Sequence, residues 1–177
     1  MRLEKQILSN LILCEDYIRK TIAFLKEDYF LDAEFRLVFG TIQQHFQKYN
    51  QTPSKNALLI SLQENRQVTE ELYGKSEELI NSLNEIEPDQ DWLVDQTEKF
   101  CKDKAVYNAI MQSIQIIDGQ DKLHTVDSLP SILSDALGVG FDNHVGHDYV
   151  ADAELRYDFY HREEEKLSKI GNTQCCT

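Results

Sequence analysis

Apolar residues recur three and four positions apart along nearly the whole sequence, and this spacing constrains the fold more than any other feature. It is the period of an amphipathic α-helix, whose apolar side chains lie along one side. Only 7 glycines and 3 prolines interrupt the 177 residues, so few positions break a helix. The pattern predicts an all-α fold, in which a compact multi-helix domain with a helical hairpin precedes a linker and a protruding docking helix.

Side chains that can cap helices indicate where the predicted helices begin and end. An apolar helix opens the chain, and a short second one ends near Asp28. Asp32, Ser54 and Thr69 are each expected to accept hydrogen bonds from the free backbone N–H groups of a following helix. Asn50 is expected to end the third helix, just before a Thr-Pro turn. The fifth helix should bury a stripe that consists of Leu72, Leu79, Ile80, Leu83 and Ile86.

A long helix is predicted from about residue 91 to residue 117, after a break at Pro88 and Asp89. One apolar stripe consists of Leu93, Thr97, Phe100, Lys104, Tyr107, Met111 and Ile114, and a second of Val106, Ile110, Ser113 and Ile117. A helix that is apolar on two sides buries both of them. One side can pack on its own domain, and the other needs either a helix at residues 128–137 or another subunit. The expected self-association hairpin includes Val106, Tyr107, Ile110, Met111, Ile114 and Ile117.

The C-terminal part of the sequence differs from the rest. Residues 1–140 are expected to form one compact domain, 141–147 a linker, 148–170 a helix and 171–177 an unstructured tail. In that helix the apolar spacing is typical of a seam that docks on another surface. It carries too little apolar surface to fold alone. The predicted docking residues are Val150, Ala153, Tyr157, Tyr160 and Leu167.

The acidic balance of the chain argues against direct nucleic-acid binding. Its 31 acidic and 18 basic residues give a net charge of −13. A phosphate backbone is bound mainly through Lys and Arg, and no cluster of these residues occurs. No apolar run approaches the ~18 residues of a membrane span, and charges interrupt the N-terminus too early for a secretion signal. We therefore expect a cytoplasmic protein that binds neither nucleic acid nor membranes directly.

The cysteines and three of the histidines suggest no special chemistry. Cys14 and Cys101 lie singly within helical patterns, where a small buried thiol is the simplest interpretation. Two more cysteines are adjacent at the end of the chain, and no CxxC spacing for zinc occurs. A disulfide is not expected in the cytosol. His45, His124 and His161 are expected on the surface.

No sequence motif for catalysis is present. The signatures of P-loop NTPases, dinucleotide-binding folds, α/β-hydrolases and zinc peptidases are all missing. His144 and His147 could hold a metal ion with Asp148 or Asp152 as a third ligand, but this falls short of the ligand count of a closed zinc site. Gly146 also lies between the two histidines. We therefore expect no catalytic residue, no cofactor and no metal ion.

Several short motifs follow one another in a specific order. They are Ile12-Leu13, Asp28-Tyr29-Phe30, Val38-Phe39-Gly40-Thr41-Ile42 and Thr52-Pro53-Ser54. Two later groups are Asp91-Trp92-Leu93-Val94 with Thr97-Glu98-Lys99-Phe100, and Phe141-Asp142 with Val145-Gly146-His147-Asp148. In this order the motifs resemble the N-terminal domain and linker of DnaB-like replicative helicases, and the two later groups resemble those of large tailed phages most closely. The resemblance covers about residues 3–169.

The resemblance implies that the chain is the N-terminal collar domain and linker helix of a hexameric helicase in DNA replication. Its role would be assembly, through contacts between subunits and contacts with primase and the helicase loader. His147 would then belong to the entry of a helix that docks on the ATPase domain of the neighbouring subunit. Helicases of this family continue into an ATPase domain, whereas this sequence ends with GNTQCCT. The chain is therefore not expected to be an enzyme, whether it is a domain, a truncated product or a piece of a split gene.

Two other functions compete with this interpretation. One is a free-standing acidic helical protein that binds a basic partner or mimics DNA by its charge. The net charge favours it, but the acidic residues are spread along amphipathic helices rather than set in a phosphate-like row. The other is a metal-dependent enzyme, which depends only on His144 and His147 and is the weakest of the three.

Overall fold

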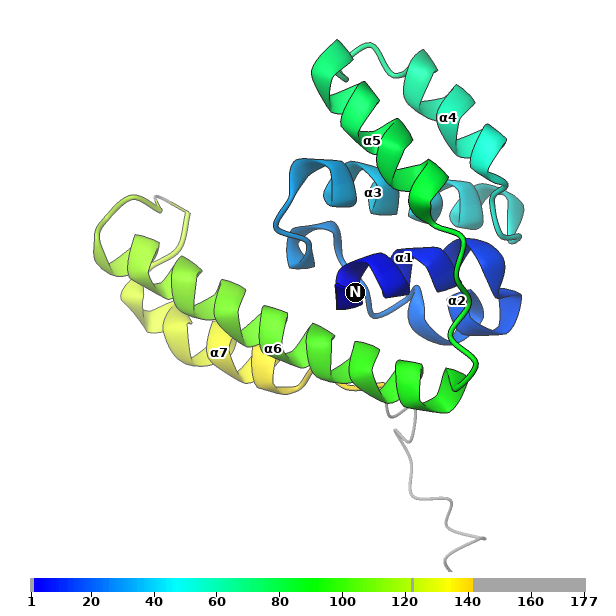
Figure 1. Cartoon of the computed structure of the whole chain (residues 1–177). Helices are drawn as coiled ribbons and strands as arrows, with labels where there is room; N and C mark the ends of the chain where they lie inside the picture. Colours follow the sequence, from blue (N-terminus) through cyan, green and yellow to red (C-terminus); the bar gives the residue numbers. More distant parts are fainter. Residues whose placement is uncertain (1, 122, 142–177) are drawn as a thin grey trace, which may run out of the picture. The chain divides into compact units, whose positions relative to one another are not determined.

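The computed structural model describes residues 2–121 and 123–141, which form one compact unit. The described residues form α-helices and short 3-10 helices without a strand, and this confirms the predicted all-α class. The linker from residue 142, the docking helix at 148–170 and the tail at 171–177 lie outside the described residues. The elements are α1 (Leu3–Leu13), α2 (Glu15–Thr21), η1 (Glu27–Tyr29), α3 (Ala33–Tyr49), α4 (Lys55–Glu64), α5 (Glu70–Ser82), α6 (Gln90–Ile117), η2 (Val126–Ser128) and α7 (Leu129–Leu137) (Figure 1).

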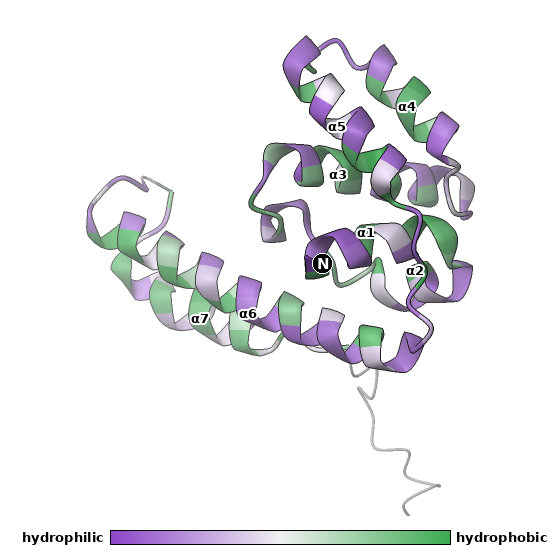
Figure 2. Ribbon diagram, viewed as in Figure 1, coloured by the Kyte–Doolittle hydropathy of each residue, from purple (hydrophilic) through white to green (hydrophobic). Residues whose placement is uncertain are grey.

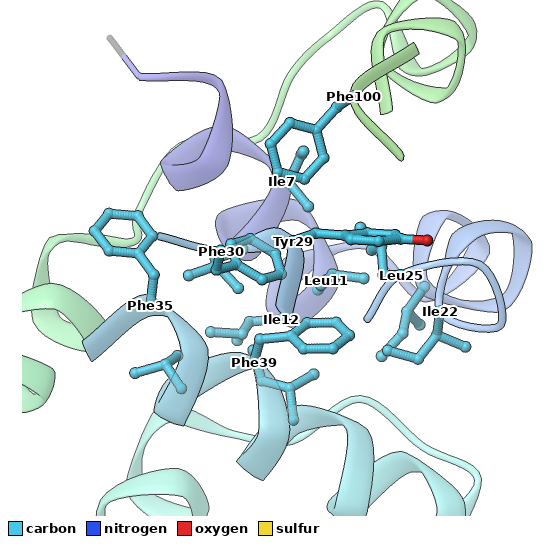
Figure 3. Packing of buried hydrophobic residues seen from close by; sticks show 14 of the residues in the cluster. Ile7, Leu11, Ile12, Ile22, Leu25, Tyr29, Phe30, Phe35, Phe39 and Phe100 are labelled. Carbon is cyan, nitrogen blue, oxygen red and sulfur yellow. The ribbon is translucent and has the colours of Figure 1, made fainter. Parts of the chain in front are cut away.

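An aromatic cluster holds the first three helices and the start of α6 together. Phe30 follows η1 and is fully buried, with its ring centroid 5.0 Å from that of Phe39 on α3 and 5.8 Å from that of Phe100 on α6. Figure 3 shows these rings around the aliphatic side chains Ile7 and Leu11 of α1. Aromatic pairs at such distances contribute about 0.5–1.5 kcal/mol beyond the burial of their area. The Tyr-Phe turn therefore supplies the centre of the core.

Local capping signals place the end of α3 and the starts of α4 and α5 where the sequence predicted them. Ser54 Oγ accepts a hydrogen bond from the backbone N–H of Ala57 at 3.2 Å, and Thr69 Oγ1 accepts one from that of Leu72 at 3.3 Å. Asn50 adopts a left-handed conformation, with φ of 52°, and ends α3. Asparagine tolerates this region better than most residues, because its short polar side chain hydrogen-bonds locally. The second helix was predicted to end near Asp28, but α2 ends at Thr21, because Ile22 and Leu25 are buried in the turn before η1 rather than in a helix.

The predicted cap at Asp32 was wrong. Asp32 lies directly before α3, but its carboxylate makes no hydrogen bond to the helix backbone. It pairs instead with the guanidinium of Arg2, which also contacts the carboxylate of Glu4. The hydrogen bond to Asp32 is the main cause of the raised pKa of Arg2. The carboxylate is thus directed toward a long-range partner instead of the N–H groups at the start of α3.

The fifth helix is shorter than its apolar spacing predicted. α5 ends at Ser82, and Ile86 lies beyond it with 54% of its surface exposed. The segment after α5 is held against α1 instead of continuing the helix. The Oδ1 atom of the buried Asn10 on α1 accepts hydrogen bonds from the backbone N–H of Glu87 at 3.1 Å and from Nε2 of Gln90 at 3.0 Å. The other predicted members of the stripe are buried or half-buried, namely Leu72, Leu79, Ile80 and Leu83.

Buried polar groups attach α6 to the bundle. The hydroxyl of Tyr17 on α2 lies 2.6 Å from Oγ1 of Thr97 on α6. Cys101 is buried as predicted, and burial raises the pKa of its thiol to about 12. The thiol of Cys101 therefore remains neutral at physiological pH. Cys14 lies at the junction of α1 and α2 rather than within a helix, and it is half-buried, so its predicted position was wrong.

Candidate self-association surface

The long helix α6 packs on the bundle through its first part and on α7 through its second part. Leu93, Thr97 and Phe100 are buried among the residues of the bundle. Figure 1 shows the later part of α6 extending past α1–α5 with α7 beside it, so that the two helices form a hairpin. The helix predicted at residues 128–137 is therefore the one that covers a side of α6.

Small side chains form the side of α6 that α7 covers. Ala105 and Ala109 are buried there, and Ala136 is buried on α7. Small residues let two helices approach closely, so these alanines form the surface on which α6 packs against α7. None of these α6 residues belongs to either apolar stripe predicted from the sequence. The prediction that a helix covers one side was right, but it assigned that side to larger residues.

The opposite side of α6 carries an exposed apolar stripe. At 100° per residue, positions 107, 110, 111, 114 and 117 lie on one side of the helix, roughly opposite Ala105 and Ala109. Between 42% and 64% of the surface of each of these residues is exposed. The stripe consists of Tyr107, Ile110, Met111, Ile114 and Ile117. Val106, the sixth predicted residue, is half-buried and packs against the core.

Charged side chains are missing from this part of α6. Residues 105–117 contain none, although 28% of the whole chain is charged. α7 carries a single charge, on Asp135. Figure 2 shows apolar residues along the second half of α6 and along α7. An exposed helix side normally carries charges, whereas the centres of protein–protein interfaces are depleted of them.

The sequence interpretation did not identify the apolar residues that α7 and the preceding loop add. Leu133 is 36% exposed and Leu137 is 74% exposed, and they share one side of α7 because they are four residues apart. Leu123 and Val126 are also exposed in the loop and in η2. The spacing of Leu133 and Leu137 was a signal that could have been found. It was overlooked because the helix was considered only as a cover for α6.

The described residues offer no metal centre. No group of three His, Cys, Asp or Glu side chains among them could hold a metal ion. His124 is exposed, and its Nδ1 lies 2.8 Å from the carboxylate of Asp121. His45 is half-buried beside the ring of Tyr49, so the prediction of a surface position was only partly right. The candidate ligands His144, His147, Asp148 and Asp152, together with His161, lie outside the described residues.

No helix in the described part of the chain is long and apolar enough to span a membrane. This applies also to α6, which is the longest at 28 residues but is interrupted by charges in its first half.

Comparison with known proteins shows one informative similarity. The chain is 33% identical over 169 residues to a DnaB-like replicative helicase of Enterobacteria phage T4. The match covers 91% of this chain and 35% of the length of that helicase. No family model matches the sequence. The resemblance that the ordered motifs indicated is thus confirmed, for a chain that corresponds to about a third of its relative.

Proposed function

We propose that this chain is the N-terminal assembly region of a DnaB-like replicative helicase, and that it acts in DNA replication by bringing helicase subunits and their partners together. The observation that carries the proposal is the 33% identity over 91% of the chain with only 35% of a phage replicative helicase. Identity spread over so much of a chain supports a shared fold and a related role in the larger protein. The all-α fold of the described residues agrees with the fold that the resemblance implies.

We propose further that subunits associate through the exposed apolar stripe of α6, together with Leu133 and Leu137 of α7. Full burial of one large apolar side chain contributes about 1.5–3 kcal/mol. The five residues of the stripe are each about half exposed, so each can still contribute roughly 1 kcal/mol. A two-fold symmetric contact uses both copies of each residue, which gives about 10 kcal/mol. This is comparable with the cost of association of ~4–15 kcal/mol, so the stripe supports a weak, concentration-dependent pair to which Leu133 and Leu137 add further burial.

The remaining parts of this proposal follow from the resemblance alone. Residues 1–140 would form the collar domain, and the seam at residues 148–170 would dock on the ATPase domain of a neighbouring subunit. Primase and the helicase loader are the proposed partners of the collar. The chain itself is proposed to lack ATPase activity and to bind DNA only as part of the assembly.

Sedimentation velocity of the 177-residue chain tests the assembly role. The proposal predicts a reversible, concentration-dependent oligomer that takes up the helicase ATPase domain encoded by the same genome. A chain that remains monomeric at every concentration and ignores the ATPase domain would favour the free-standing acidic protein instead.

A further inference from the structure

A groove of about 510 Å³ lies away from the hairpin, where η1, α3 and α4 meet. Its walls come from one side of α3 and from the C-terminal end of α4, while Glu27 of η1 lies at its edge. The lining residues are Glu27, Ala33, Arg36, Leu37, Gly40, Thr41, Gln44, Ser61, Glu64 and Asn65. We refer to it as the α3–α4 groove.

The floor of the α3–α4 groove is one side of α3. Ala33, Leu37 and Gly40 recur there at helical spacing; Ala33 is exposed, Leu37 is half-buried against the core and Gly40 is buried. Gly40 lets Glu27 lie close to the helix, because a Cβ atom at Gly40 would be only 2.5 Å from Oε1 of Glu27. The groove thus combines an apolar floor with a carboxylate directly above it.

Most polar groups of the α3–α4 groove already have partners. The hydroxyl of Thr41 donates to the carbonyl of Leu37 at 2.8 Å, and that of Ser61 donates to its own helix backbone at 2.9 Å. The guanidinium of Arg36 donates to the carbonyls of Phe30 and Leu31. These groups are therefore not free to bind a ligand.

The two carboxylates of the groove differ from these groups. Among the described residues, neither Glu27 nor Glu64 has a hydrogen-bond or ion-pair partner for its carboxylate. Some acidic residues on other exposed helix sides are paired, such as Glu15 with Arg19 and Glu71 with Lys75, while others in the described part of the chain are unpaired, such as Glu78. The groove presents two unpaired negative charges beside its floor, together with the positive charge of Arg36, which is held by two backbone carbonyls.

We propose that the α3–α4 groove binds a basic segment of another protein of the replication complex, in which an apolar side chain is flanked by Arg or Lys. The apolar side chain would lie on Ala33, Leu37 and Gly40, and the flanking cations would pair with Glu27 and Glu64. The net charge of −13 favours the approach of a basic partner. This inference rests on the proposed function only in taking the chain to be a partner-binding region.

Titration of the isotope-labelled 177-residue chain with a defined peptide tests the proposal by NMR. The probe is a helical peptide with leucines at helical spacing and lysines beside them, and the matched peptide carries glutamates in place of the lysines. We expect the lysine peptide to shift the amide signals of Gly40, Thr41 and Ser61. Replacing Glu27→Gln together with Glu64→Gln should weaken its binding about threefold to tenfold, as for the loss of two exposed ion pairs.

A control variant separates the α3–α4 groove from general attraction to an acidic protein. Glu78→Gln together with Glu85→Gln removes two exposed charges outside the groove and should leave the affinity unchanged. The proposal is overturned if no groove amide shifts, if the glutamate peptide binds equally well, or if the control pair weakens binding as much. The groove variant should keep the wild-type oligomeric state, so failure here is distinguishable from failure of the assembly role.

Discussion

Replacing Ile110→Glu should break self-association without unfolding the chain. Ile110 is 48% exposed and lies in the charge-free part of α6, on the side opposite α7. In the single chain a glutamate there can reach water, and its helix propensity is at least that of isoleucine. At most about 1 kcal/mol of half-buried apolar contact is lost within one chain, which lowers the melting temperature of a domain of this size by only a few degrees.

The effect on a symmetric interface is larger, because the change occurs twice. Two copies lose about 2 kcal/mol of apolar burial together. Each of the two new carboxylates loses water without gaining a partner, which costs at least about 1–3 kcal/mol apiece. A total of at least about 4 kcal/mol corresponds to a dissociation constant that is roughly a thousandfold higher or more.

Sedimentation velocity over a range of concentrations measures the dissociation constant, and circular dichroism on the same samples measures whether the chain remains folded. The matched control is Ile60→Glu, since Ile60 is also an isoleucine on a helix and is 57% exposed, but it lies on α4. The control should associate like the wild type. If Ile110→Glu keeps the wild-type mass at all concentrations, or if both variants lose association equally, the stripe on α6 is not the interface.

Three further predictions concern the stability of the fold. Gly40→Ala should raise the free energy of unfolding by up to about 1 kcal/mol, because alanine favours a helix interior and the exposed end of Glu27 can move away. If urea denaturation shows a lower free energy of unfolding for Gly40→Ala but a higher one for the control Gly74→Ala, the contact with Glu27 is rigid and the prediction is wrong. Asn10→Ala should cost about 1–3 kcal/mol, because the buried N–H of Glu87 loses its acceptor, whereas the exposed Asn56→Ala should change stability by less than about 0.5 kcal/mol; equal effects would refute this role. Stability should fall as the pH rises from about 9 towards 12, because the thiol of Cys101 ionises near 9.0 when unfolded while burial raises its pKa to about 12 in the fold, so the unfolded state binds fewer protons. Burial also raises the pKa of Tyr17 and Tyr29, so Cys101→Ala should remove only the part of the dependence that begins near pH 9, and an unchanged dependence would refute the role of the thiol.

The helix boundaries could be predicted because their signals are local. Ser54, Thr69 and Asn50 act through hydrogen bonds or backbone angles within a few residues of themselves. The predicted cap at Asp32 was wrong because its carboxylate pairs with Arg2, which is distant in the sequence. The predicted end of α5 was wrong for a similar reason, because Asn10 on α1 accepts a hydrogen bond from Glu87 in the segment that follows.

The candidate site could be predicted in part. Apolar periodicity identified the large residues of the exposed stripe on α6, but it divided them between two predicted stripes, whereas the structure places Tyr107, Met111 and Ile114 on the same side as Ile110 and Ile117. It did not identify the packed side at Ala105 and Ala109, because alanine carries little hydrophobic signal and its value there is its small size. The α3–α4 groove was also missed, because it depends on the approach of Glu27 to Gly40, which no spacing along the chain encodes.

Native mass spectrometry of the chain mixed with the ATPase domain encoded by the same genome tests the central claim most directly. The account predicts mixed ring-sized assemblies for the wild type, and their loss with Ile110→Glu but not with Ile60→Glu. A second variant, Tyr157→Asp with Tyr160→Asp, should abolish uptake of the ATPase domain while leaving the chain's own association intact. A monomeric chain that forms no complex with the ATPase domain would contradict a role in helicase assembly.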